Sequence, residues 1–69
     1  MYPKIETYHN VFGLWRIERL STKGKRPRYT LWFWIRHLNK WVLLANQGRR
    51  KTCFELADSG YRLDELKGE

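Results

Sequence analysis

The stretch from Thr22 to Trp41, TKGKRPRYTLWFWIRHLNKW, places two tryptophans one residue apart directly after a cationic segment. Within it, Tyr29 to Leu38 is rich in aromatic and β-branched residues and predicts a β-strand. Because side chains alternate between the faces of a strand, Trp32 and Trp34 share one face and Phe33 lies on the other. Both faces are apolar, which is typical of the central strand of a sheet.

The flanking residues predict two further antiparallel strands. Phe12 to Leu20 alternates in polarity, and Trp41 to Asn46 has the composition of a returning strand. Ser21 to Arg28 lacks apolar residues and is predicted to be a loop. Asn39 and Lys40 are predicted to form a tight hairpin turn, since Asn tolerates positive φ.

A short helix is predicted after the third strand. Thr52 and Glu55 have the spacing of a capping box, so we expect the helix to begin at Cys53. Gly60 is a natural C-terminal stop, which limits the helix to about two turns. The apolar residues at three-to-four spacing that would cover the sheet are Phe54, Ala57 and Tyr61.

The chain length favours a single domain over residues 1–69, because a chain this short buries only about 60% of the surface that its unfolded form exposes. Residues 1–10 show no strong periodicity and are interpreted as an N-terminal arm packed at the sheet edge. Residues 61–69 are interpreted as a short helical turn that frays. The predicted fold class is α+β: a three-stranded antiparallel sheet packed by one short C-terminal helix, in the order β-β-β-α.

The positive charge is concentrated in the first three quarters of the chain. The formal net charge is +7, and residues 1–51 hold twelve Lys or Arg against Glu6 and Glu18, a net of +10. A polyanion such as nucleic acid is the commonest partner of such a surface. The alternative is that these cations only keep an aromatic-rich protein soluble.

The predicted nucleic-acid contacts fall into three groups. One group is the cationic loop, a second precedes the predicted helix, where free backbone amides add positive potential, and a third lies between them. With six to eight phosphate contacts, affinity would fall by about three to five decades between low and moderate salt. The predicted residues are Lys23, Lys25, Arg26, Arg28, Trp32, Trp34, Arg36, Arg49, Arg50 and Lys51.

The face that carries Trp32 and Trp34 has several possible occupants. The indoles are either core, covered by the N-terminal arm, or a surface for a second copy of the chain or a ligand. Indoles bordered by guanidinium groups suit stacking on unpaired bases, and they suit a protein hot spot equally well. The alternative function is therefore a protein-interaction module, such as a phage-encoded inhibitor of a host protein or a homodimer.

Two resemblances to known modules support a nucleic-acid partner. The sequence GLW at residues 13–15, the turn KGKR at 23–26 and RKT at 50–52 resemble the AP2-like arm-binding domains of phage and transposon integrases, which implies a sheet face lying in the major groove of DNA. The stretch GRRKT at 48–52 resembles the final part of a double-stranded RNA-binding domain, where basic residues at a helix start contact phosphates. Small size and high charge also resemble the accessory proteins of phages.

The composition argues against several other classes. Cys53 is the single cysteine, and with only His9 and His37 beside it no zinc-ligand spacing exists, so we expect neither a disulfide nor a metal or other cofactor. No pairing of a nucleophile with a base suggests an enzyme, and we expect Cys53 to be a small core residue. Apolar runs such as Leu31 to Ile35 are far short of the roughly 20 residues of a membrane span. We expect a cytoplasmic protein.

Overall fold

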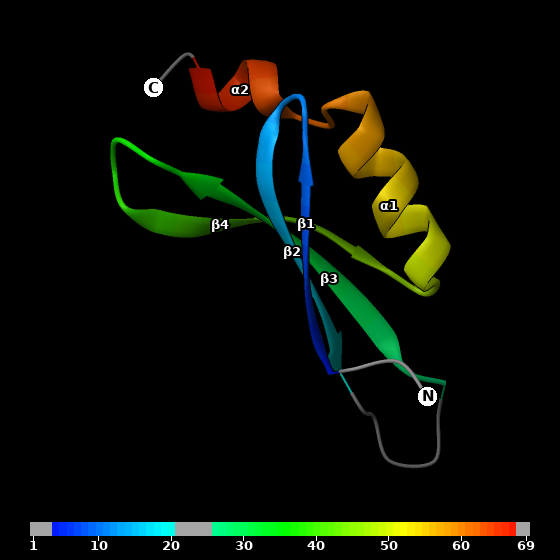
Figure 1. The fold of residues 1–69 in the computed structure, drawn as a ribbon. Helices are drawn as coiled ribbons and strands as arrows, with labels where there is room; N and C mark the ends of the chain where they lie inside the picture. The colour runs from blue at the N-terminus through cyan, green and yellow to red at the C-terminus, as the bar shows by residue number, and fades with distance from the viewer. Residues whose placement is uncertain (1–3, 21–25, 68–69) are drawn as a thin grey trace.

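The computed structural model describes residues 4–20 and 26–67, which form one antiparallel sheet and two helices (Figure 1). The sheet has the order β1-β2-β3-β4, so each strand pairs with its neighbours in sequence. None of the helices in these two ranges is long and apolar enough to cross a membrane. The elements are β1 (Ile5–Asn10), β2 (Gly13–Leu20), β3 (Arg28–Ile35), β4 (Lys40–Gln47), α1 (Arg50–Ser59) and α2 (Leu63–Lys67).

The prediction of three strands is wrong, because the predicted N-terminal arm forms the fourth strand, β1, at the edge of the sheet. Its residues that face α1 are polar, so the sequence shows no apolar alternation. Glu6 accepts two hydrogen bonds of 2.6 Å from Arg50. The Tyr8 hydroxyl donates to Asp58 at 2.5 Å, and the Asn10 amide donates to the Ala57 carbonyl at 3.0 Å. Apart from the edge-to-face contact of the Tyr8 ring with Phe54, polar contacts to the helix thus replace the apolar contacts expected of a strand.

The core lies between α1 and one face of the sheet. Trp15 and Leu31 are fully buried there, together with Cys53 and Ala57 of the helix. The Trp15 and Phe33 rings meet edge to face at 4.7 Å. The helix therefore covers the face that carries Trp15 and Leu31. The opposite face, here called the outer face, carries the side chains that alternate with them along each strand.

A bulge in β4 changes which of its side chains reach the outer face. Leu31 pairs with Ala45 but the next pair is Trp32 with Leu43, so Leu44 is an extra residue. Leu44 and Ala45 are both buried. If β4 alternated strictly, with no bulge at Leu44, Trp41 would lie on the same face as Ala45, under the helix. The bulge instead brings Trp41 opposite Trp34 on the outer face.

The ends of α1 match the prediction on one side only. Gly60 ends the helix with φ 71°, and the Tyr61 amide bonds the Leu56 carbonyl at 3.0 Å, as expected for a glycine stop. The predicted start at Cys53 is wrong, because the helix begins at Arg50 after Arg49, whose side chain makes no capping bond. Residues 50–52 can also be helical, because the first four N–H groups of a helix have no intrahelical acceptor and so place few demands on the first turn.

The two remaining connections also differ in detail from the prediction. The turn between β3 and β4 covers residues 36–39, and Asn39 has the expected positive φ of 54°. Lys40, predicted to be in this turn, is the first residue of β4. The helical turn predicted near the C-terminus is α2, whose Leu63 packs into the core.

Candidate nucleic-acid interface

Four strand termini and the start of α1 meet at one end of the sheet. The pairs Ile5 with Glu18, Leu20 with Arg28 and Tyr29 with Gln47 bring together the start of β1, the end of β2, the start of β3 and the end of β4. Cations lie on or next to all of these termini. We call this region the basic end; its described residues are Lys4, Arg19, Arg26, Arg28, Arg49, Arg50 and Lys51.

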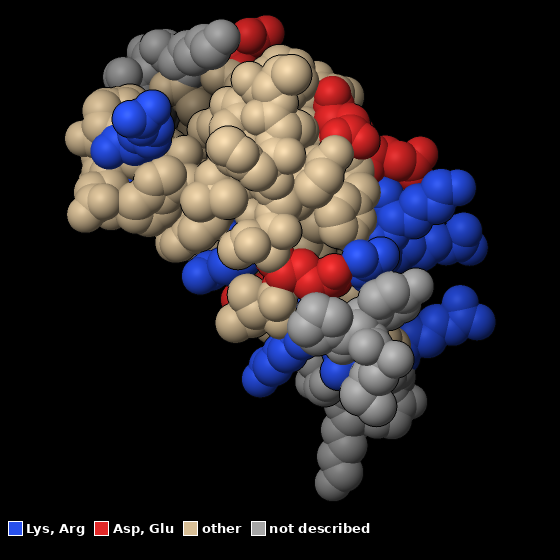
Figure 2. Space-filling model, viewed as in Figure 1, with Lys and Arg blue, Asp and Glu red and all other residues tan. Residues whose placement is uncertain are grey.

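Five cations of the basic end are exposed, and they come from three segments that are distant in sequence. Lys4 precedes β1, Arg26 and Arg28 lie at the start of β3, and Arg49 and Lys51 lie at the start of α1. Lys and Arg side chains project mainly from the lower and right-hand parts of the molecule in Figure 2. Because most acidic residues follow residue 52, only Glu6 and Glu18 lie on strands that reach this end.

Arg28 is exposed but held in place by its neighbour on β4. Its Nε donates to Asn46 Oδ1 at 2.8 Å, and its terminal nitrogen donates to the Asn46 carbonyl at 3.4 Å. These bonds use one edge of the guanidinium group, which has five N–H donors. The group is therefore oriented by the sheet while donors remain for an anion.

Arg50 has a structural role that the sequence did not indicate. Its guanidinium forms a bidentate ion pair with Glu6 and lies over the Phe54 ring at 4.6 Å. The hydrogen bond from Arg50 lowers the pKa of Glu6 below its ordinary value of 4.5. Arg50 thereby joins α1 to β1, and of the predicted triplet at the helix start, Arg49 and Lys51 are the exposed members.

The outer face carries a cluster of one arginine and three tryptophans. The Arg16 guanidinium lies 5.0 Å from the centre of the Trp32 ring and 4.8 Å from that of Trp41. Trp34 and Trp41 are in contact, with ring centres 5.2 Å apart and planes tilted by 60°. We call these four residues the aromatic cluster; all of them are half-buried.

Hydrogen bonds fix the orientation of one of these rings. Trp32 Nε1 donates to Thr30 Oγ1 at 2.9 Å, and the Thr30 hydroxyl donates to the Glu18 carbonyl at 3.3 Å. Arg16 Nε is buried and has no hydrogen-bond partner among the described residues. The contact of Arg16 with Glu18 is long, at 3.9 Å. The guanidinium is therefore held mainly by the faces of the two indoles, an arrangement that cation–π attraction stabilises.

The structure separates Arg36 from the predicted residues of the basic end. Arg36 follows β3 at the end opposite Arg28, roughly 25 Å away along the strand at about 3.3 Å per residue. Its expected place beside Trp32 is taken by Arg16. Alternation in β2 places Arg16 on the face opposite Trp15, but only the register of β2 with β3 shows that it pairs with Trp32. Lys23 and Lys25 lie outside the described residues.

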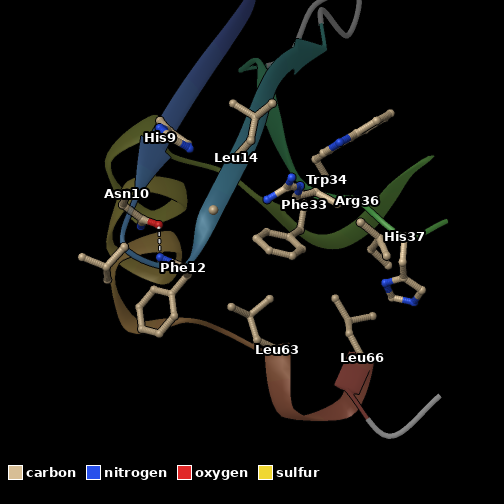
Figure 3. A pocket seen from close by; sticks show the side chains of 13 residues that line it. His9, Asn10, Phe12, Leu14, Phe33, Trp34, Arg36, His37, Leu63 and Leu66 are labelled. Carbon is tan, nitrogen blue, oxygen red and sulfur yellow. Dashed lines mark hydrogen bonds between the residues drawn. The ribbon is translucent and has the colours of Figure 1, made fainter. Parts of the chain in front are cut away.

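An open groove of about 880 Å³ lies at the end of the sheet opposite the basic end. Figure 3 shows Phe33, Leu63 and Leu66 pointing toward its centre, with His37 at the rim. Leu14 and Trp34 also line it, so the groove adjoins the outer face. Its lining is mainly apolar, which suits a hydrophobic side chain better than a phosphate.

Residues able to perform nucleophilic or metal chemistry are not gathered in the described part of the chain. Cys53 is fully buried in the core, and this burial raises the pKa of its thiol to about 11. A thiol in this state is a poor nucleophile at neutral pH. Among residues 4–20 and 26–67, no three His, Cys, Asp or Glu side chains are placed to hold a metal ion.

Comparison with protein-family models, curated proteins and solved structures yields no match for this chain. The resemblances to integrase arm-binding domains and to double-stranded RNA-binding domains therefore stay predictions. The features of the structure that bear on function are the basic end and the aromatic cluster, which lie on one sheet.

Proposed function

We propose that this protein binds nucleic acid, with DNA ahead of RNA, and that the basic end contacts the phosphates. The observation that carries the proposal is the convergence of exposed Lys and Arg residues from three separate segments at one end of the sheet. A cluster of like charges is costly in the free protein and is relieved when an anionic polymer neutralises it. The order of DNA before RNA follows the resemblance to integrase arm-binding domains, but the docking of a sheet face in the major groove that this resemblance implies is not part of the proposal.

The start of α1 strengthens the positive potential of this end. The first amide groups of a helix have no intrahelical partner, and the helix dipole adds a partial positive charge there. The side chain of Arg49 leaves these amides uncapped, and no acidic residue lies in the first turn. Both features favour a phosphate at this position.

Salt dependence of binding tests the proposal. Five exposed cations that each neutralise one phosphate give a slope of log affinity against log salt of about −3.5 for a single strand and about −4.5 for B-form DNA. Between 50 and 200 mM salt the affinity should therefore fall roughly 130-fold to 500-fold. The measurement is fluorescence anisotropy of labelled DNA and RNA of equal length. Binding that does not change with salt rejects the proposal.

A second candidate function is a protein-interaction module, such as an inhibitor of a host protein or a homodimer. The observation that favours it is the exposure of Ile5 and Leu43 on the outer face, at 51% and 47%. Light scattering coupled to size exclusion separates a homodimer from a monomer. A dimer that covers the aromatic cluster shows tryptophan emission that is blue-shifted, resists quenchers and changes on dilution.

A further inference from the structure

We propose that the outer face of the sheet is a stacking platform for unpaired bases, so that the preferred ligand is single-stranded nucleic acid. This inference rests on the proposed function, because the basic end supplies the phosphate contacts. It adds Arg16 and Trp41 to the interface. In this inference the aromatic rings stack on bases and are not part of the protein core.

The strand register assembles the platform from two rows of side chains. Cross-strand neighbours on one face have Cβ atoms about 5 Å apart, so each row is continuous. Neither row lies under α1, because α1 packs against the opposite face. One row consists of Thr7, Arg16, Trp32 and Leu43, and the other contains His9, Leu14, Trp34 and Trp41.

The rings of the platform are oriented before any ligand binds. The hydrogen bond to Thr30 fixes Trp32, and the Arg16 guanidinium packs against both Trp32 and Trp41. A surface that is already ordered loses little side-chain entropy on binding. The positive charge of Arg16 also lies within the ring cluster, where it attracts the electron-rich faces of bases.

The platform is continuous with the basic end along β3. Alternation places Arg28, Thr30, Trp32 and Trp34 on the same face, and the bond of Arg28 to Asn46, the partner of Thr30, agrees with this. Successive members of this line are about 7 Å apart. A strand whose phosphates contact Arg28 can therefore extend along β3 and place its bases over the two indoles.

The same surface is poorly suited to a duplex. Reading a groove requires polar groups directed at base edges, whereas the rows present indoles, Leu14 and Leu43. The faces of paired bases are hidden in the stack, and exposing one costs a few kcal/mol. Unpaired bases offer their faces without this cost, and stacking on an aromatic side chain accepts any base.

The first test compares three ligands on the wild-type chain, so it does not depend on the folding of a variant. The first ligand is oligothymidine of about 15 nucleotides, a length suited to single-strand sites. The other two are an abasic backbone with the same number of phosphates and a duplex of the same length. We expect oligothymidine to bind at least about ten-fold more tightly than either of the others. Equal affinity for oligothymidine and the abasic backbone overturns the platform.

The second test uses Trp34→Ala, since among the described contacts Trp34 is joined to the cluster only through Trp41. The matched control is Leu38→Ala, which truncates an exposed side chain in the turn between β3 and β4, outside both rows. Trp34→Ala should weaken oligothymidine binding by roughly 5- to 150-fold and leave the abasic backbone unaffected, while Leu38→Ala changes neither by as much. Equal loss for oligothymidine and the abasic backbone overturns the platform.

The outcomes separate this inference from the proposed function. If oligothymidine, the abasic backbone and the duplex bind equally with a steep salt dependence, the platform is wrong and binding through the basic end stands. If none of them binds, and an RNA of the same length does not bind either, both are wrong. If light scattering shows a dimer that Trp34→Ala dissociates without affecting oligothymidine binding, the platform is overturned in favour of an interface between two copies.

Discussion

Removing two cations from the basic end should weaken the binding of nucleic acid, and the number of exposed cations that remain sets the size of the loss. Arg49 and Lys51 are exposed, Arg49 makes no side-chain capping bond, and among the described residues neither forms an ion pair like that of Arg50 with Glu6. Arg49→Ala with Lys51→Ala should therefore leave the fold intact. It reduces the exposed cations of this end from five to three, which lowers the salt slope for a single strand from about −3.5 to about −2.1.

The loss of affinity follows from the change in slope. We take the electrostatic contribution to vanish near 1 M salt, which is about 1.3 decades of salt concentration above 50 mM. Over that range a slope difference of about 1.4 gives a roughly 70-fold loss of affinity at 50 mM. Anisotropy titrations at several salt concentrations measure both quantities. Circular dichroism checks that the double variant is folded.

The matched control removes the same net charge at the other end of the sheet. Arg36 and Lys40 are both exposed and lie beyond the opposite end of β3. For an abasic backbone of about five phosphates, which the basic end alone can bind, Arg36→Ala with Lys40→Ala should change the affinity by less than about three-fold, because both residues lie farther from that end than the Debye length of about 10 Å at 0.1 M salt. Equal losses in the two double variants would refute the reasoning, since they would show that binding depends on net charge and not on the basic end.

Three further predictions concern stability and reactivity. Glu6→Gln should lower the free energy of unfolding at neutral pH by about 1.5 kcal/mol, since the ion pair with Arg50 is partly exposed; because the folded pKa of Glu6 is lowered, wild type should lose this advantage as pH falls below 4.5, and denaturant titrations at several pH values check this. Cys53, with a thiol pKa of about 11, should resist a thiol reagent at about pH 8 until the chain is unfolded; rapid labelling of the native chain would contradict this. Gly60→Ala should cost about 1–2 kcal/mol in thermal unfolding, because φ is 71° and the new Cβ would lie 3.0 Å from the Phe12 ring; an unchanged transition would show that the turn relaxes freely.

The central strand and the end of the helix could be predicted from sequence because their signals are local. Six of the eight side chains of β3 are aromatic or β-branched, and Gly60 alone accounts for the left-handed turn. Trp32 and Trp34 on one face follow from a period of two. None of these features depends on which strand lies beside which.

The remaining features depend on contacts between distant residues. β1 was missed because its inward positions carry Glu6, Tyr8 and Asn10, whose partners belong to a helix more than forty residues away. The bulge that brings Trp41 to the outer face exists only in the register of β3 with β4. No local pattern in the sequence identifies the extra residue.

The candidate site shows the same division. Exposure of Arg26, Arg28, Arg49 and Lys51 agrees with their loop and helix-start composition. The ion pair of Arg50 with Glu6 depends on the fold, and the sequence next to either residue does not indicate it. The charge pattern thus indicates which residues are cationic, whereas strand register determines which of them share a surface.

The most direct test of the account is a nuclear magnetic resonance titration of the ¹⁵N-labelled chain with oligothymidine. We expect the largest amide shift changes at Lys4, at Arg26 and Arg28 and at residues 46–51, together with changes in the indole N–H signals of Trp32 and Trp34. Changes confined to the groove residues Phe12, Leu63 and Leu66, at the opposite end, would contradict it.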